Sequence, residues 1–420
     1  MKKNKLLFFL SLFIILISIS YLSFIIAENK ILYIEKFDAK KYQKIYENSQ
    51  WMKAEPKVKN EWAIKLGYTG WDNYIDETQG KDEKLNSLIP VKGISDEDLY
   101  SYSGYEYIKG KNPILLNPEA PPLGKYLIGL SIILFNNQRV ISIITAFLCL
   151  FLIFIITKKI THSNLFSSIA VLLTTTNTLF TDQITHTPQL EIFQLFFILL
   201  FIFIFSIFKE KNKYQFLILS GIILGFSFSI KVFFLNYILV NSWLLIYYFL
   251  RYLLKKGEIK TAIKEILLLN IIALFSFTLT YVMYFIHEGS LRGFLGTQKW
   301  IFHFYQQSSI NTGKLLGSYL NLILFNKWKV WSEGYPIVKY EYWSFSWSII
   351  FLFGLASCFF LGLSKKIKKN SLILILISFI AVYNAFLFIV PIFPRYLLLL
   401  FIPLNILIAV LLSKLIKIKK

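Results

Sequence analysis

Acidic side chains are concentrated in one stretch of this sequence. Asp96, Glu97 and Asp98 are consecutive, and Tyr100 follows them closely. Glu119 comes next, just before the Pro pair of the segment EAPPLGK. A carboxylate can remove the proton from an attacking hydroxyl if it lies within hydrogen-bond distance, so general-base chemistry is one interpretation. A solvated loop or a helix N-cap would explain three consecutive acids equally well.

Further single charges lie at the ends of long apolar runs. Asp182 follows one such run, Lys231 ends another and Arg395 begins the last. Glu191 lies a few residues inside a run, and Arg292 follows one. Ionisable groups at such depth are costly unless they are paired or functional. Lysine and arginine can also extend to the headgroups, whereas a glutamate cannot do so easily, which favours a paired or catalytic role for Glu191.

The amino-acid composition indicates the class of protein that carries these residues. Of the 420 residues, 56% are hydrophobic, 18% are aromatic and only 16% are charged, with a formal net charge of +21. A soluble domain has about a quarter of its residues charged. A disordered or nucleic-acid-binding chain with this net charge would be poor in Ile, Leu and Phe. We therefore predict an all-α polytopic membrane protein, with the lipid bilayer and not nucleic acid as a partner.

Apolar runs long enough to span a bilayer, which takes about 20 residues, give the helix count. We predict ten spans, with the short run 123–135 lying as a helix in the membrane interface instead of crossing. The ten predicted spans are 6–27, 139–157, 164–180, 188–208, 214–231, 235–254, 264–287, 343–363, 371–390 and 395–416.

The charge distribution supports this count. With both termini inside, the predicted inner segments carry 21 basic and three acidic residues, so +18 of the net +21 is cytoplasmic. That asymmetry follows the positive-inside rule, and counting 123–135 as an eleventh span would break it. The predicted organisation is a first helix over 1–27, an extracytoplasmic loop over 28–138, spans over 139–287, a second such loop over 288–342 and spans over 343–420.

Several motifs, in order, resemble type C glycosyltransferases. The DE-x-x-Y pattern of Asp96, Glu97 and Tyr100, followed by PPLGK, resembles the family's first outer loop. HTPQLEIFQLFF resembles its second acidic loop, GIILGFSFSIKVFFL its lysine segment and FPRYLLLLFIPL its last helix. The similarity is greatest to the protein O-mannosyltransferase and aminoarabinose-transferase branch. Ala120 stands where the latter has a basic residue after Glu119, and either Asp182 or Glu191 could be the second acid.

The resemblance implies an inverting glycosyltransferase of the cell membrane with its active site on the extracytoplasmic side. It would move a sugar, mannose or another, from a polyprenyl phosphate to a hydroxyl of a protein, lipid or glycan. Asp96 and Glu97 are the implied catalytic residues, with Asp98 as a rival base. Glu119, Asp182, Glu191, Lys231, Arg292 and Arg395 would bind donor or acceptor. No metal-ligand cluster is visible in the sequence, and no cofactor is assigned with certainty; dependence on a divalent metal stays open because members of the family differ in it. A transporter or flippase for a lipid-linked glycan is the alternative.

Overall fold

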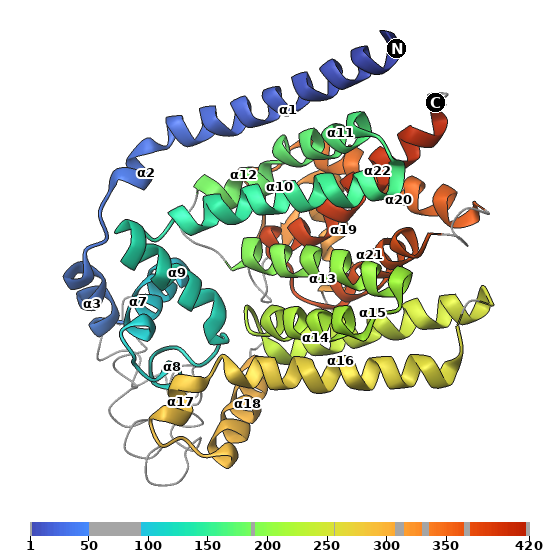
Figure 1. The fold of residues 1–420 in the computed structure, drawn as a ribbon. Coiled ribbons are helices and arrows are strands. Elements are labelled where there is room, and N and C mark those ends of the chain that lie inside the picture. The colour runs from blue at the N-terminus through green and yellow to red at the C-terminus, as the bar shows by residue number, and fades with distance from the viewer. Residues whose placement is uncertain are drawn as a thin grey trace.

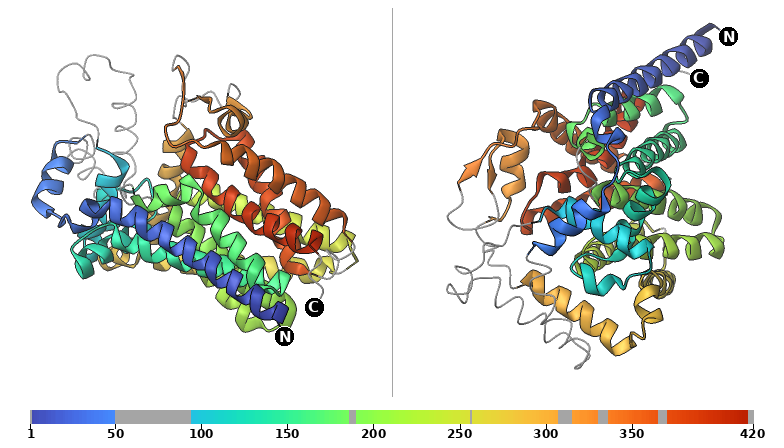
Figure 2. Two further views of the ribbon diagram at one scale, coloured as in Figure 1. Left: turned by 90° about the horizontal axis from the view of Figure 1, so that it is seen from above. Right: turned by 90° about the vertical axis from the view of Figure 1, so that its left-hand side faces the viewer.

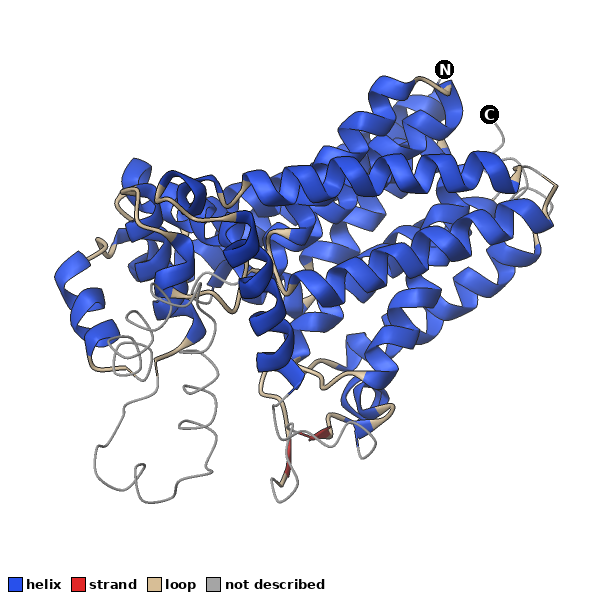
Figure 3. Cartoon of the chain, turned by 90° about the horizontal axis from the view of Figure 1, so that it is seen from below, coloured by secondary structure: helices blue, strands red, loops and turns tan. Residues whose placement is uncertain are grey.

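The computed structural model describes residues 2–49, 94–185, 190–255, 257–306, 315–329, 336–364 and 370–416. Most of these residues are helical (Figures 1 and 3). The strands among them are β1 (Trp328–Lys329) and β2 (Ile337–Val338), which pair antiparallel. Much of the predicted first outer loop, residues 50–93, lies outside the described part. The all-α membrane class predicted from composition is confirmed.

Eight described helices are long and apolar enough to cross a bilayer. They correspond to eight of the ten predicted spans: α1 (Lys2–Glu28), α10 (Val140–Thr161), α13 (Glu191–Lys211), α15 (Phe233–Leu253), α16 (Ile259–Leu279), α20 (Phe345–Leu363), α21 (Ser371–Ile389) and α22 (Leu398–Leu415), the last continuous with the 3₁₀ turn η3 (Pro394–Leu397).

The other two predicted spans form shorter helices. The run 164–180 is interrupted after α11 (Asn164–Thr175) and continues as α12 (Thr178–Thr185). The interruption lies in a polar stretch, where the Asn177 side chain accepts a hydrogen bond from the amide of Leu179 at 2.9 Å and so caps the new helix. The run 214–231 forms α14 (Tyr214–Phe228), which ends before Lys231. The two helices α11 and α14 have 12 and 15 residues, fewer than the about 20 of a full span, so the length criterion counts eight of the described helices as spans and leaves these two below it.

Both chain ends lie at one end of the long bundle (Figures 1 and 2). The short helices gather at the opposite end. These short helices are α2 (Lys30–Ile34), α3 (Ala39–Glu47), α7 (Asp96–Ile108), α8 (Pro113–Leu116), α9 (Pro122–Phe135), α17 (Val282–Ile286) and α18 (Leu291–Gln306); α19 (Ser318–Phe325) packs against α20 and α21.

Helix α22 occupies the core of the bundle, and most of its side chains are buried. It packs against α11 and α20, whereas α1 lies at the edge and leaves most of its apolar side chains exposed. That exposure is what a lipid-facing helix requires, since lipid tails are as apolar as leucine. The internal position of α22 matters because η3, which carries Arg395, leads directly into it.

Helices α7 and α9 pack backbone against backbone, which holds the acidic segment in place. A Cβ atom at Gly104 would come within 2.2 Å of the Lys125 carbonyl oxygen, and one at Gly129 within 2.0 Å of the Gly104 carbonyl oxygen. Only glycine allows this approach. The predicted helix over 123–135 is therefore present as α9, with α7 as its close partner.

Candidate functional site

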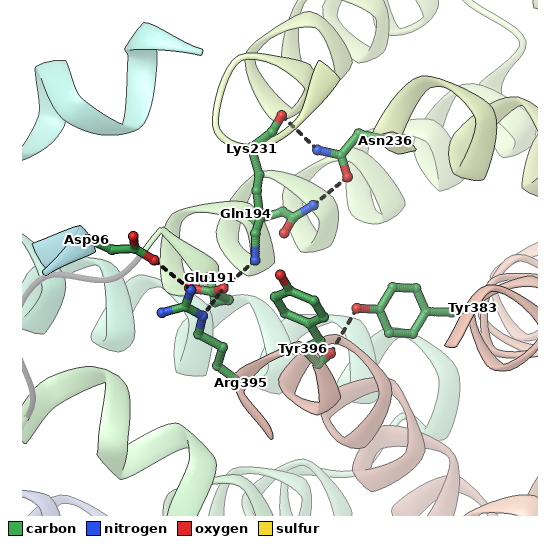
Figure 4. Close-up of polar contacts among 8 residues, drawn as sticks. All are labelled: Asp96, Glu191, Gln194, Lys231, Asn236, Tyr383, Arg395 and Tyr396. Carbon is green, nitrogen blue, oxygen red and sulfur yellow. Dashed lines mark hydrogen bonds and ion pairs between the residues drawn. The ribbon is translucent and has the colours of Figure 1, made fainter. Parts of the chain in front are cut away.

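Three of the predicted site residues lie where bundle helices start or end. Glu191 is the first residue of α13, Lys231 lies in the turn between α14 and α15, and Arg395 is the second residue of η3. A proline at the start of η3 suits the first helical turn, where its missing N–H is not needed. The N-terminus of α13 favours a carboxylate because of the helix dipole. The three side chains point toward one another (Figure 4).

Glu191 joins the two cations. Its carboxylate accepts a hydrogen bond from the Lys231 ammonium, and the Arg395 Nε lies 3.0 Å from Glu191 Oε1. The Glu191 side chain is only 3% exposed, whereas those of Lys231 and Arg395 are each 19% exposed. A buried carboxylate between two cations is stabilised by both of them. Each cation still reaches the surface, where an anionic ligand could contact it.

Arg395 also reaches the acidic segment of α7. Its NH2 group donates a hydrogen bond to Asp96 Oδ2 at 2.9 Å (Figure 4). The Asp96 side chain is 45% exposed. The structure thus brings together Asp96, Glu191, Lys231 and Arg395, four residues that are distant in the sequence; we call them the charge cluster. Its two carboxylates and two cations balance, so an arriving phosphate would have to compete with a carboxylate for the same donors.

The acidic run forms the first turn of α7, and the N-cap of this helix is Ser95 and not one of the three acids. The Ser95 hydroxyl accepts a hydrogen bond from the Asp98 amide at 3.1 Å, and all three acids lie in the first turn. Only Asp96 of these three has a described contact with Arg395. The Asp98 charge acts on Tyr42 of α3, whose pKa is raised by burial first and by this charge second. Glu97 lies between them in the same turn. The three acids can thus stabilise the N-terminus of α7 while Asp96 also contacts Arg395.

Glu119 lies in the loop between α8 and α9. Burial and, secondarily, the nearby Asp96 charge raise the pKa of Glu119 from 4.5 to about 7. The fully buried Lys125 of the PPLGK segment closes this loop, because its ammonium donates to Asn117 O at 2.6 Å, Asn117 Oδ1 at 2.8 Å and Ala120 O at 2.7 Å. Burial lowers the pKa of Lys125, and the nearby Glu119 charge opposes that shift.

The other two predicted residues are Asp182 and Arg292. Asp182 is buried in α12, and its charge acts on Tyr340 and Tyr342 of the segment before α20. Burial, and then the Asp182 charge, raises the pKa of Tyr340, which the Arg395 charge opposes. Tyr340 is therefore near both the Asp182 and the Arg395 charges. Arg292 is exposed in α18, and none of the described contacts joins it to the charge cluster.

A layer of polar residues behind the charge cluster was not predicted. Gln194 Nε2 donates to Asn236 Oδ1 at 2.6 Å, and Asn236 Nδ2 donates to the Lys231 carbonyl at 3.1 Å. The Lys231 ammonium lies 3.8 Å from the centre of the Tyr396 ring. A sequence signal existed for Gln194, because it lies three residues after Glu191 and therefore on the same helix face. In the sequence, Asn236 is only a single amide side chain within an apolar run. Many transmembrane helices contain such an amide, so it is no signal of a site.

In the described ranges, no group of three or more His, Cys, Asp or Glu side chains could hold a metal ion. Asp96 contacts a guanidinium, and Glu191 contacts that guanidinium and an ammonium. Cations in these positions would repel a divalent metal. The arrangement instead suits an anion that carries a phosphate.

One family model matches the chain. It describes dolichyl-phosphate-mannose-protein mannosyltransferases and covers residues 119–285, less than half of the chain. Glu119, Asp182, Glu191 and Lys231 lie within the matched region, whereas Asp96, Arg292 and Arg395 lie outside it. No curated protein matches the chain significantly. The similarity to these mannosyltransferases thus covers the second acidic segment and the lysine segment.

Proposed function

We propose that this multi-pass membrane protein is a glycosyltransferase that moves a sugar from a polyprenyl phosphate to an acceptor hydroxyl. The observation that carries the proposal is the charge cluster, in which Arg395 connects an exposed carboxylate with a buried one beside Lys231. The match to dolichyl-phosphate-mannose-protein mannosyltransferases supports the reaction class and makes mannose the first sugar to test. Protein, lipid and glycan hydroxyls are all acceptors to be tested.

The reaction requires one base and one phosphate site. The acceptor oxygen attacks C1 of the sugar from the face opposite the phosphate, so the configuration inverts. The bond between C1 and the phosphate oxygen breaks, and polyprenyl phosphate leaves with the electron pair. The acceptor proton passes to a carboxylate, for which we propose Asp96 because it is the more exposed acid of the cluster. Phosphate is already a good leaving group, so no general acid is needed.

Lys231 and Arg395 are the proposed phosphate partners. Arginine can bind a phosphate through two parallel hydrogen bonds, and the cations stabilise the charge that grows as the phosphate leaves. In the free protein Arg395 contacts Asp96 instead. We propose that a phosphate binding to Arg395 displaces Asp96, whose carboxylate is then free to take the proton of the acceptor hydroxyl. The base would become active only when the donor is present.

The extracytoplasmic orientation is part of the proposal. The cluster lies at the end of the bundle opposite both chain ends, and the lysine-rich loops predicted to be cytoplasmic include the turn after α13. The positive-inside rule then supports an outer position for the cluster. Lipid-linked sugar could reach it from the outer leaflet. Labelling of single cysteines introduced at exposed positions on either end of the bundle, in intact cells, tests this orientation.

Release of polyprenyl phosphate tests the proposed reaction. Purified protein in detergent is given a labelled mannosyl or aminoarabinosyl polyprenyl phosphate together with candidate acceptors, and cleavage is followed by chromatography. Cleavage that depends on an acceptor supports the proposal.

The alternative function, a transporter or flippase, would move the intact donor across a vesicle membrane without cleavage. Such transporters often bind their substrate at broken helices near mid-membrane, and the break between α11 and α12 is the feature that favours testing it.

A further inference from the structure

Two buried polar side chains hold the main chain on either side of the charge cluster. Asn236, in the first turn of α15, donates to the Lys231 carbonyl at 3.1 Å. Tyr383 of α21 donates its hydroxyl to the Tyr396 carbonyl at 2.8 Å. Asn236 and Tyr383 are 8% and 3% exposed. The two residues they hold face each other, because the Lys231 ammonium lies over the Tyr396 ring (Figure 4).

Around Lys231 these hydrogen bonds form a ring that starts and ends at this residue. Gln194 donates to Asn236 at 2.6 Å, and Gln194 lies one helical turn after Glu191 on α13. Glu191 in turn accepts from the Lys231 ammonium. Both parts of Lys231 are thus tied to the first turn of α13. Its carbonyl is linked through Asn236 to Gln194, and its ammonium is bound directly by Glu191. We call Gln194 and Asn236 the amide brace.

From this geometry we infer that the amide brace is a positioning device for the phosphate-binding lysine, and that Asn236 is a positioning residue for donor binding. The inference rests on the proposed function. Lys231 lies in a turn and not in a helix, so no helical hydrogen bond fixes its carbonyl. A flexible lysine would lose rotamer freedom on binding a phosphate, and a lysine that is already held loses less. We therefore expect the amide brace to raise the affinity for the donor, in addition to stabilising the fold.

The chain contains a matched control pair. Asn241, one and a half turns further along α15, exchanges hydrogen bonds with Asn270 of α16 at 2.8 and 3.1 Å and donates to the Tyr237 carbonyl at 2.9 Å. This pair has the same chemistry as the brace: an amide that holds a main-chain carbonyl and a second amide. None of its described contacts reaches the charge cluster. Loss of Asn241 should therefore cost stability without affecting the donor.

The experiment compares Asn236→Leu with Asn241→Leu in the full-length protein in detergent. Undecaprenyl phosphate is titrated, its affinity is measured by thermal shift, and the melting temperature without ligand is recorded. We expect Asn236→Leu to weaken the affinity by about tenfold, equivalent to about 1.4 kcal/mol, and Asn241→Leu to leave it within twofold. Gln194→Leu should weaken it in the same direction. With a cleavable donor, Asn236→Leu should raise KM more than it lowers kcat.

A third variant separates failure of the brace from failure of the proposed function. Lys231→Ala should abolish most of the affinity for undecaprenyl phosphate. If Lys231→Ala weakens binding and Asn236→Leu binds as tightly as the unmodified protein, the positioning role is wrong and the phosphate site stands. If Lys231→Ala binds normally, the phosphate site itself is wrong. If Asn236→Leu does not fold, Gln194→Leu with Asn241→Leu as its control gives the same comparison.

Discussion

Replacing Glu191 with glutamine tests the charge balance of the cluster. The substitution keeps the shape of the side chain and removes the negative charge between Lys231 and Arg395, both of which contact the same carboxylate oxygen. Removing one partner of a buried ion pair typically costs about 3–5 kcal/mol. The two cations here retain some solvent exposure, so we expect about 3 kcal/mol. In a protein of this size that is a fall in melting temperature of roughly 3–6 °C.

The same substitution should strengthen phosphate binding. Two unit charges roughly 5 Å apart repel by about 3 kcal/mol at an effective dielectric constant of about 20. A bound phosphate relieves that repulsion, and it no longer has to displace Glu191 from the cations. Affinity for undecaprenyl phosphate should therefore rise by roughly ten- to a hundredfold, and turnover should fall because the product leaves slowly. Thermal shift with titrated ligand measures both the lost stability and the affinity.

Glu265 provides the control for this prediction. Near the opposite end of the bundle it accepts hydrogen bonds from the Lys209 ammonium and the Tyr248 hydroxyl, and its side chain is 6% exposed. Glu265→Gln should lower the melting temperature similarly without raising phosphate affinity. If Glu191→Gln binds undecaprenyl phosphate no more tightly than the unmodified protein, Lys231 and Arg395 do not form a phosphate site and the reasoning is refuted.

Three further predictions concern the acidic segment and its partner. Asp96→Asn should abolish transfer and leave the melting temperature within a few degrees, measured with a labelled donor; retained turnover would exclude Asp96 as the base and make Asp98→Asn the next test. Arg395→Lys keeps the charge but cannot contact Asp96 and Glu191 together, so kcat/KM should fall by roughly 10- to 100-fold, and unchanged kinetics would contradict the bridging role. The raised pKa of Glu119 means that its protonated form is favoured by folding, so its contribution to stability is full below about pH 4.5 and is lost as the pH rises to about 7. The melting temperature of the unmodified protein relative to Glu119→Gln should fall over that interval, and parallel pH curves would show that Glu119 is not buried as described.

The fold class followed from composition because the length and polarity of each apolar run report directly on a bilayer. The exact helices did not follow, since hydropathy cannot detect a break such as the one between α11 and α12. There the polar residues Thr176 and Asn177 end one helix and begin the next. Hydropathy also treats 214–231 as one run, although the helix stops at Phe228 and leaves Lys231 in a turn.

The site was predictable in part for a similar reason. Charges at the ends of apolar runs are rare and therefore conspicuous, so the sequence alone indicates Glu191, Lys231 and Arg395. Their pairing depends on which helix ends meet, and no local pattern encodes that. Asn236 and Tyr383 escaped detection because uncharged polar residues are common in transmembrane helices. Arg292 was named on the same end-of-run criterion and is exposed in α18, apart from the described contacts of the charge cluster.

The most direct test of the central claim is the acceptor-dependent release of polyprenyl phosphate from a labelled lipid-linked sugar, measured for the unmodified protein and for Asp96→Asn side by side. For the unmodified protein, we expect release of polyprenyl phosphate and transfer of the sugar to the acceptor with inverted configuration at C1. For Asp96→Asn, we expect neither release nor transfer. Equal release by both proteins would contradict the assigned base. Transport of intact donor across a vesicle membrane, with no cleavage in the presence of any acceptor, would contradict the proposed glycosyltransferase function itself.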